Sequence, residues 1–290
     1  MRSALEYVML RTGIIILRLF PEKWVRSGMG RLFARVQFRR DVAIANLKMV
    51  FQEKDKAWRE KLLKKMYYNY GLTAVETYIT PSHKLFPKMK IEGYELIEKE
   101  LEKGKGVLVA SGHLGNFEMA GRWLAHDIPL GVVIKRQHNP YFDKYANDCR
   151  IKDKCTLIKV GNALRPILKL LKQNGLVMIM TDQNARSQGY QLDFMGSPAS
   201  THITLARIAI KYGIPIAIAG ITRDENGYPL TVFRSPIDPT EYENSEDGYV
   251  KLMQKVLDEF GNMVKEYPEH WFWVHRRWRQ AELGKVMSDE

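Results

Sequence analysis

Apolar residues in the first 80 positions recur at the spacing of amphipathic helices. This periodicity continues until Pro81, which cannot continue a helix. The pattern predicts an N-terminal helical segment over residues 1–80. The helices are expected at 4–20, 22–40, 41–51 and 57–77.

Beyond Lys90 the pattern changes to short apolar runs that alternate with helical stretches. This alternation predicts an α/β domain over residues 81–290, with a mostly parallel sheet covered by helices on both faces. The two parts can also pack as one unit. Strands are expected near 106–111, 130–135, 156–160, 176–181, 214–221 and 230–234. Helices are expected at 94–103, 114–126, 140–152, 162–174, 201–212 and 246–266.

The apolar run 106–110 leads through Ser111 and Gly112 to His113, and a helix is expected to begin there. His113 would then lie at the carboxyl end of a strand, where open α/β sheets bind ligands. The positive end of the helix dipole disfavours an imidazolium. We therefore expect a neutral His113 that can accept a proton.

An acid, Glu118, follows His113 by five residues and could hold its second ring nitrogen. Regular helix would point the two side chains apart, so the pair requires that His113 precede the helix. The alternative is a structural histidine with satisfied hydrogen bonds. We favour a base because of the junction at which His113 lies.

The positive charge of the chain is concentrated in its first part. Residues 1–80 hold 16 Lys and Arg against 7 Asp and Glu, a net charge of +9 out of +12 for the whole chain. An anionic partner is therefore expected, such as anionic lipid or an acidic carrier protein. No nucleic-acid-binding signature accompanies the charge, so nucleic acid is not an expected partner.

Two N-terminal segments have the character of helices that lie on a membrane. Residues 4–20 are apolar but interrupted by Arg11 and Arg18, and they are short for a span, so a shallowly inserted or interfacial helix fits better. In residues 22–40 an apolar face is flanked by arginines, which favours anionic lipid. An ordinary surface helix with solvated arginines is the alternative for residues 22–40.

The two cysteines, Cys149 and Cys155, have neither metal-ligand spacing nor a disulfide pattern, which fits a reducing compartment. No metal is expected. A cleaved signal peptide is not expected either, because no small-residue cleavage site follows the apolar stretch.

Six short segments carry motifs in a fixed order along the chain. They are Arg39–Leu47, His113–Glu118, Lys135–Pro140, Thr181–Gln183, Asp193–Ala199 and Trp273–Trp278. Together they resemble the motifs of the late acyltransferases of lipid A biosynthesis, the lauroyl and myristoyl transferase family. That family is part of the wider superfamily that includes glycerol-phosphate acyltransferases with a His-x4-acid motif.

The resemblance implies transfer of a fatty acyl chain from an acyl-carrier-protein or coenzyme A thioester to a hydroxyl of a membrane glycolipid. No bound cofactor is implied. His113 would be the general base, with Glu118 as its partner. Lys135 or Arg136 would stabilise the oxyanion or bind an acceptor phosphate; the family commonly has Arg where this chain has Lys135.

Further binding residues are implied by the same resemblance. Arg150 lies where the family has another basic residue, and Asn116 belongs to the His113 motif. Asp182 ends a strand at the expected ligand-binding edge and could position Arg136 or Arg150. The polar segment 184–200 is expected to be a loop that covers substrate.

The aromatic and basic side chains of residues 271–278 are expected either at an interface with lipid head groups or in a packed C-terminal strand. The implied location is the cytoplasmic face of the inner membrane, with peripheral or shallow attachment. The sequence leaves the oligomeric state and the acyl-chain length open.

Two other functions remain possible at this point. The same residues could acylate a glycerol phosphate or a mannosylated phospholipid, or the chain could be a non-enzymatic basic binding module. An acyl-enzyme is not expected, because neither cysteine is placed beside His113.

Overall fold

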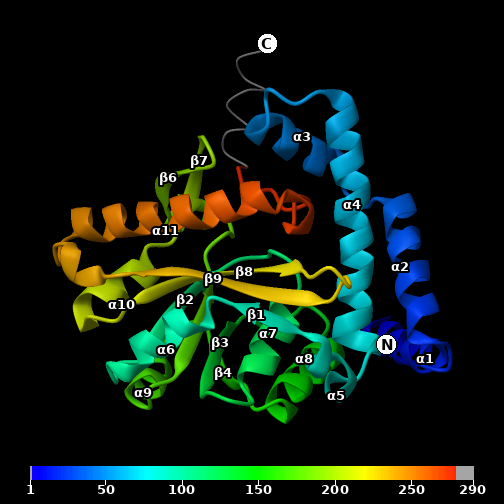
Figure 1. Ribbon diagram of the computed structural model, residues 1–290, viewed down its shortest axis with the longest axis horizontal. Helices are drawn as coiled ribbons and strands as arrows, with labels where there is room; N and C mark the ends of the chain where they lie inside the picture. Colours follow the sequence, from blue (N-terminus) through cyan, green and yellow to red (C-terminus); the bar gives the residue numbers. More distant parts are fainter. Residues whose placement is uncertain (1, 279–290) are drawn as a thin grey trace.

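A seven-stranded sheet forms the centre of the computed structural model, which describes residues 2–278 (Figure 1). Its order is β1-β9-β8-β2-β5-β3-β4, and every neighbouring pair is parallel except β8 and β9. The predicted α/β class with a mostly parallel sheet is confirmed. The strands are β1 (Lys90–Glu92), β2 (Val107–Ser111), β3 (Leu130–Ile134), β4 (Thr156–Lys159), β5 (Leu176–Met180), β8 (Ile216–Arg223) and β9 (Pro229–Ile237).

Helices cover both faces of this sheet and extend beyond one end of it (Figure 1). The α-helices are α1 (Arg2–Leu17), α2 (Glu22–Val36), α3 (Arg40–Val50), α4 (Lys56–Ala74), α5 (Ser82–Leu85), α6 (Tyr94–Glu102), α7 (Phe117–Leu124), α8 (Pro140–Lys152), α9 (Leu164–Lys172), α10 (Thr204–Tyr212) and α11 (Glu246–Glu266). A π-helix, η1 (Val75–Ile79), continues α4, and short 3₁₀ turns lie at η2 (Phe86–Lys88), η3 (Arg186–Gln188), η4 (Pro239–Glu241) and η5 (Pro268–His270).

Strand β2 is buried on both faces, which explains its uninterrupted apolar sequence. Val107 and Val109 belong to a core with side chains of α6 and α7. Leu108 and Ala110 belong to a second core that includes α10 and α11. The end of β2 is therefore held rigidly between two packed layers, and whatever follows it is well positioned.

The N-terminal helices share the core of the sheet domain. Leu63 and Met66 of α4 are fully buried in the same cluster as the α11 side chains. Helix α2 packs so closely on α4 that a Cβ on Gly71 would lie only 2.4 Å from the Met29 carbonyl oxygen. The division at residue 80 stays a prediction. Met1 and residues 279–290, the ends of the two predicted domains, lie outside the described residues.

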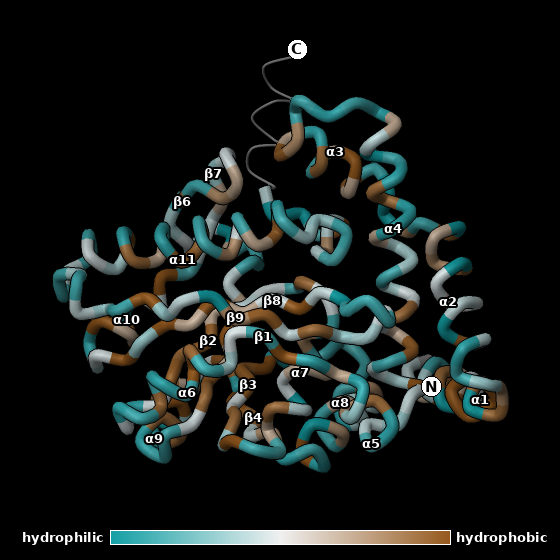
Figure 2. Tube along the Cα trace, viewed as in Figure 1, coloured by the Kyte–Doolittle hydropathy of each residue, from teal (hydrophilic) through white to brown (hydrophobic). Residues whose placement is uncertain are grey.

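Helix α1 lies at the outer end of the molecule, and much of it consists of hydrophobic residues (Figure 2). Val8, Met9 and Ile15 are more than half exposed, whereas Ile14 is buried against η1 and α2. Arg18, one of the two arginines that interrupt this apolar segment, contacts the protein, since its Nε donates to the Ile79 carbonyl. Among the described residues, no helix combines the length and hydropathy that crossing a bilayer requires.

Helix α2 differs from its predicted form. It ends at Val36 instead of continuing to residue 40, because Gln37 takes a left-handed conformation with φ 47°. Its expected single apolar face is divided: Val25 is buried, while Leu32 and Val36 are exposed. The inner part of that face packs on neighbouring helices instead of meeting lipid.

Two other expectations need correction, and one strand was not expected. Helix α7 begins at Phe117, not at residue 114, because Gly115 has φ 65° and Leu114 forms a β-bridge with Trp271. The segment expected as a covering loop contains a β-hairpin. Its strands are β6 (Tyr190–Phe194) and β7 (Ser197–Thr201), and it packs on α11 through Phe194. Finally, the short edge strand β1 was not predicted.

Candidate active site

His113 and Asp182 meet because the strands that precede them are neighbours. Strands β2 and β5 are parallel and adjacent, with Ser111 paired to Met180. His113 and Asp182 each lie two residues beyond this pair, at the carboxyl edge of the sheet. This edge is where the strand pattern predicted a ligand site.

Asp182 holds His113 by both its side chain and its backbone. Asp182 Oδ1 lies 2.9 Å from His113 Nδ1, and Oδ2 accepts the His113 backbone N–H at 2.7 Å. Trp271 Nε1 also donates to Oδ2, at 2.9 Å. Since a carboxylate faces Nδ1, that nitrogen carries the proton and Nε2 is left as a base.

The surroundings of this pair favour a protonated His113 next to an ionised Asp182. Burial lowers the pKa of His113, but the Asp182 carboxylate outweighs it and raises that pKa above 6.5. Burial likewise opposes the Asp182 charge, yet His113 and the donated hydrogen bonds lower the pKa of Asp182 to about 2. The expected effect of a helix dipole does not dominate, since α7 begins only at Phe117.

Glu118 is not the partner of His113 in the structure. It lies in the first turn of α7 and points to α8, where Arg150 Nε donates to Oε1 at 3.0 Å and Arg150 Nη2 donates to Oε2 at 2.7 Å. Glu118 is five residues from His113 in the sequence, but its side chain contacts Arg150 and not His113. The carboxylate at His113 comes from the neighbouring strand instead.

The other predicted binding residues have different positions. Lys135 and Arg136 follow β3 at the same edge of the sheet, and both are exposed with no ion-pair partner among residues 2–278. Arg150 is held by Glu118 and by Asn147. Asp182 contacts His113 instead of positioning Arg136 or Arg150.

Asn116 is buried and caps α7, so its role in the structure is to hold the backbone. Its Oδ1 accepts the Met119 backbone N–H at 3.1 Å. The preceding Gly115 permits the turn, since a Cβ there would lie 2.0 Å from the Ile221 carbonyl oxygen. Together these two residues hold the chain between His113 and the helix in one conformation.

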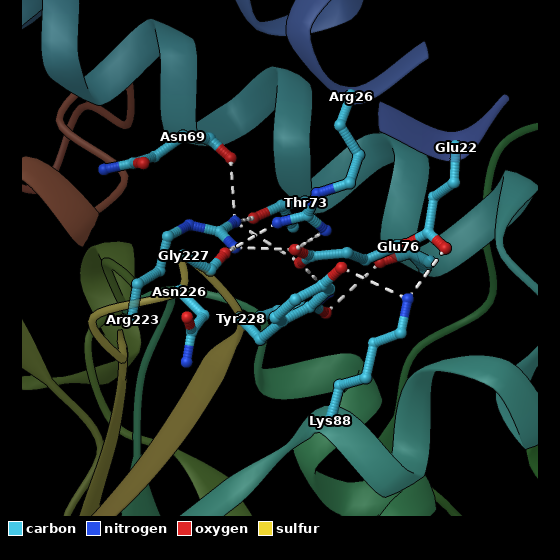
Figure 3. Close-up of polar contacts among 12 residues, drawn as sticks. Glu22, Arg26, Asn69, Thr73, Glu76, Lys88, Arg223, Asn226, Gly227 and Tyr228 are labelled. Carbon is cyan, nitrogen blue, oxygen red and sulfur yellow. Dashed lines mark hydrogen bonds and ion pairs between the residues drawn. The ribbon is translucent and has the colours of Figure 1, made fainter. Parts of the chain in front are cut away.

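A buried charge cluster formed by Arg26, Glu76 and Arg223 (Figure 3) supports the Asn116 cap. Glu76, on the π-helix η1, is fully buried and accepts from Asn116 Nδ2 at 3.0 Å. Arg26 and Arg223 each donate to Glu76 Oε1 at 2.6 Å. Helix α2, η1 and strand β8 are thereby joined to the start of α7. Nothing in the local sequence pattern indicated Glu76.

The C-terminal aromatic and basic segment is largely buried, so it is packed as the second of its two predicted settings expected, although not as a strand. Trp271, Trp273 and Trp278 are at most 1% exposed, so they cannot lie among lipid head groups. The segment forms only a β-bridge at Trp271, not a strand. Arg277 is also buried and donates to the Ser200 carbonyl and to Thr201 Oγ1.

The aromatic ring of Phe117 lies beside His113, with 4.9 Å between the two ring centroids. Phe117 also lines a small cavity of about 60 Å³ between α7 and strands β3 and β5, with Val132, Met178 and the Glu118–Arg150 pair. The cavity is mainly apolar. It therefore extends the region beside His113 with a surface that suits methylene groups.

Nucleophilic side chains near the site are few. Cys155 is buried in that cavity wall, and burial raises the pKa of its thiol to about 12. Ser111 is fully buried, and its hydroxyl has no hydrogen-bond partner among the described residues. Among the same residues, no group of His, Cys, Asp and Glu could hold a metal ion.

Sequence reasoning missed the role of Trp271 and the pairing of Asp182 with His113. Asp182 had been recognised as a residue at the ligand edge, and the strand order provides the rest. Trp271 lies 89 positions from Asp182, and only the fold brings its indole to the carboxylate.

Comparison with known proteins gives a consistent result over most of the chain. The family model of bacterial lipid A biosynthesis acyltransferases matches residues 2–280. A lipid A biosynthesis palmitoleoyltransferase from Escherichia coli (strain K12) is 22% identical over 258 residues, covering 85% of this chain and 81% of that protein.

A phosphatidylinositol mannoside acyltransferase from Mycobacterium tuberculosis (strain CDC 1551 / Oshkosh) is 23% identical over 284 residues, covering 92% of this chain and 86% of that protein. Among solved structures, the 1-acyl-sn-glycerophosphate acyltransferase PlsC from Thermotoga maritima aligns with a TM-score of 0.40 and 15% identity. The alignment covers 84% of this chain and 98% of that one.

Proposed function

Because the chain belongs to the bacterial lipid A biosynthesis acyltransferase family and is therefore an acyltransferase, we propose that it transfers a fatty acyl chain from a thioester to a hydroxyl of a glycolipid such as a lipid A precursor. His113 is the general base of this reaction. Asp182, not Glu118, is the residue that positions it.

The observation that carries this proposal is the contact between His113 Nδ1 and Asp182 Oδ1 at 2.9 Å. It fixes the imidazole with Nε2 as the free base. Gln183 Nε2 lies 3.4 Å from that nitrogen, at the position an acceptor hydroxyl would occupy. The Asp182 charge also stabilises the imidazolium that forms when the proton is taken.

In the reaction, His113 Nε2 takes the proton of the acceptor hydroxyl as its oxygen attacks the thioester carbonyl carbon. A tetrahedral intermediate forms with a negative oxygen. It collapses to the ester as the carbon–sulfur bond breaks, and the imidazolium returns its proton to the leaving thiolate. No acyl-enzyme is required, because the base acts directly on the acceptor.

The developing negative charge needs a cation, and Lys135 and Arg136 are suitably located at the same sheet edge. Both are exposed and unpaired among the described residues, so they can turn toward a bound substrate. The ion pair with Glu118 makes Arg150 a less available cation.

Attachment to the membrane surface follows from the exposed apolar side chains of α1. Their neighbouring arginines contact the protein, with Arg18 on Ile79 and Arg11 over the ring of Tyr145 at 4.5 Å. We place the protein on the cytoplasmic face of the inner membrane. An acyl carrier protein, which is acidic, is the preferred donor on electrostatic grounds, although coenzyme A thioesters share the chemistry.

A reconstituted transfer assay tests the function. Purified protein would be given acyl-carrier-protein or coenzyme A thioesters with a lipid A precursor, a mannosylated phospholipid or a glycerol phosphate, and products would be read by mass spectrometry. We expect the lipid A precursor to be acylated. Acylation of the mannosylated phospholipid alone would favour the acceptor named in the mycobacterial relative.

A second arm of this assay tests the direct mechanism. Incubation with the thioester alone should leave the protein unmodified, because its two cysteines and Ser111 are not placed to attack. A stable acylated protein that then transfers its acyl group would contradict direct transfer.

Membrane attachment has its own test. Replacing Leu5, Met9 and Ile16 together by Ser should reduce co-sedimentation with anionic vesicles, because these exposed side chains would no longer enter the bilayer. A matched control replaces three exposed apolar residues elsewhere, Ile151, Val160 and Leu164, by Ser. Equal binding of both variants would contradict attachment through α1.

A further inference from the structure

A second, larger and more open cavity lies beside η5, the short helix that directly precedes Trp271. Its volume is about 550 Å³, and its walls come from α2, α4, the end of β8 and η5. This wall is attached to the His113 loop, because the His270 carbonyl accepts the Gly115 backbone N–H at 2.8 Å. The cavity is separate from the contacts that position the base.

The cavity is strongly cationic. Lys64 and Lys65 line it, and neither has an ion-pair or hydrogen-bond partner among residues 2–278. Glu269 is the acidic residue of the lining. Arg223 of the lining shares Glu76 with Arg26, so two guanidinium groups face one carboxylate (Figure 3).

The neutral groups of the lining offer hydrogen-bond donors. Asn69 Nδ2 donates to the Glu269 carbonyl at 3.1 Å, which identifies it as the amide nitrogen. The same nitrogen lies 3.2 Å from His270 Nδ1, which must then be the acceptor. The proton of the neutral ring is therefore on Nε2, and this donor has no partner among the described residues.

His270 is kept neutral by its surroundings. Burial, followed by the positive charges of Arg223 and Lys65, lowers the pKa of His270 to about 3. Arg223 and Lys65 both line the cavity together with this ring. Tyr68 adds a hydroxyl to the lining, also without a partner among the described residues.

We propose that this cavity binds the phosphate group of an anionic lipid headgroup. Two free ammonium groups, an imidazole N–H and a phenol O–H provide donors around one concave space, which is what a phosphate requires. The volume is that of a small-molecule site and too small for a protein helix. Helix α2, which contributes Ala34 to the cavity wall, also packs near its other end, through Val25, with Ile14 of α1, the helix through which we propose membrane contact.

Binding measurements test this site without any acyl transfer, so their outcome is independent of the proposed reaction. Titration calorimetry would use inorganic phosphate and a short-chain phosphatidic acid kept below its aggregation concentration. The variant Lys64→Gln/Lys65→Gln should bind both ligands about tenfold or more weakly, because two charge-assisted hydrogen bonds are lost. Tyr68→Phe should show a smaller loss.

A control variant, Lys56→Gln/Lys61→Gln, removes the same charge from the same helix outside the cavity. It should bind both ligands as the wild type does. Circular dichroism would confirm that each variant is folded.

The two ligands distinguish the source of the phosphate. Tighter binding of the lipid than of inorganic phosphate, lost in the cavity variant, supports a headgroup site, and equal binding lost in that variant supports a site for the phosphate group itself. The proposal is overturned if the wild type binds neither ligand, or if both double variants lose affinity equally.

Discussion

The two acid–base pairs beside the sheet differ in how the chain builds them. His113 and Asp182 are 69 residues apart and meet because β2 and β5 are neighbouring parallel strands. Glu118 and Arg150 are 32 residues apart and join the helices α7 and α8. In the first pair Nε2 of His113 remains available as a base, whereas in the second pair the two charges neutralise each other. Proximity in sequence to His113 therefore did not identify its partner.

The largest loss of activity is expected when His113 is replaced. His113→Gln should lower the acyl-transfer rate by about two to four orders of magnitude, because the acceptor hydroxyl loses its base. Single-turnover transfer would measure this, with thermal unfolding as the control for folding. A variant that kept most of the wild-type rate would remove His113 from the chemistry.

Asp182→Asn should have the next largest effect, a loss of about two orders of magnitude or more. The amide preserves the shape of the side chain but cannot stabilise the imidazolium. The same single-turnover assay applies. If the rate stayed within a few-fold of wild type while Glu118→Gln abolished it, the roles assigned to the two acids would be reversed.

Trp271→Phe should lower the rate by about tenfold, because Asp182 loses one of the donors that orient it. The ring remains to fill the core. Trp278→Phe is the matched control: Trp278 is equally buried, and its indole donates to the Phe194 carbonyl instead. Equal losses in both variants would show that packing, not the bond to Asp182, matters.

Glu118→Gln should lower the rate least, by less than about tenfold, because its contact is Arg150 and not His113. Its main expected cost is in stability, about 1–3 kcal/mol of unfolding free energy from the broken, largely buried ion pair. Chemical denaturation of Glu118→Gln, Arg150→Gln and the double variant would measure the coupling. Additive losses would contradict a direct interaction.

The sequence predicted the sheet class and the ligand edge because apolar runs report burial directly. It also placed His113, Asp182, Lys135 and Arg136 at that edge correctly, since each follows a strand. It could not give the strand order, which decides that β5 lies beside β2. The partner of His113 was therefore beyond local reasoning.

Other features required the tertiary structure altogether. Glu76 and Trp271 contact residues far away in sequence, and no spacing announces them. The hairpin of β6 and β7 was read as a loop because its segment is polar and contains glycine. Its buried residue Phe194 packs on α11, a contact that only the folded chain supplies.

The most direct test of the His113–Asp182 pair is the dependence of kcat/KM on pH in the wild type, Asp182→Asn and Glu118→Gln. Activity requires neutral His113, and the Asp182 carboxylate raises the pKa of that ring above 6.5, so activity in the wild type should fall as pH drops through a value above 6.5. Without the carboxylate this acidic limb should move to lower pH, whereas in Glu118→Gln it should stay in place. A limb that moves in Glu118→Gln and not in Asp182→Asn would contradict the account.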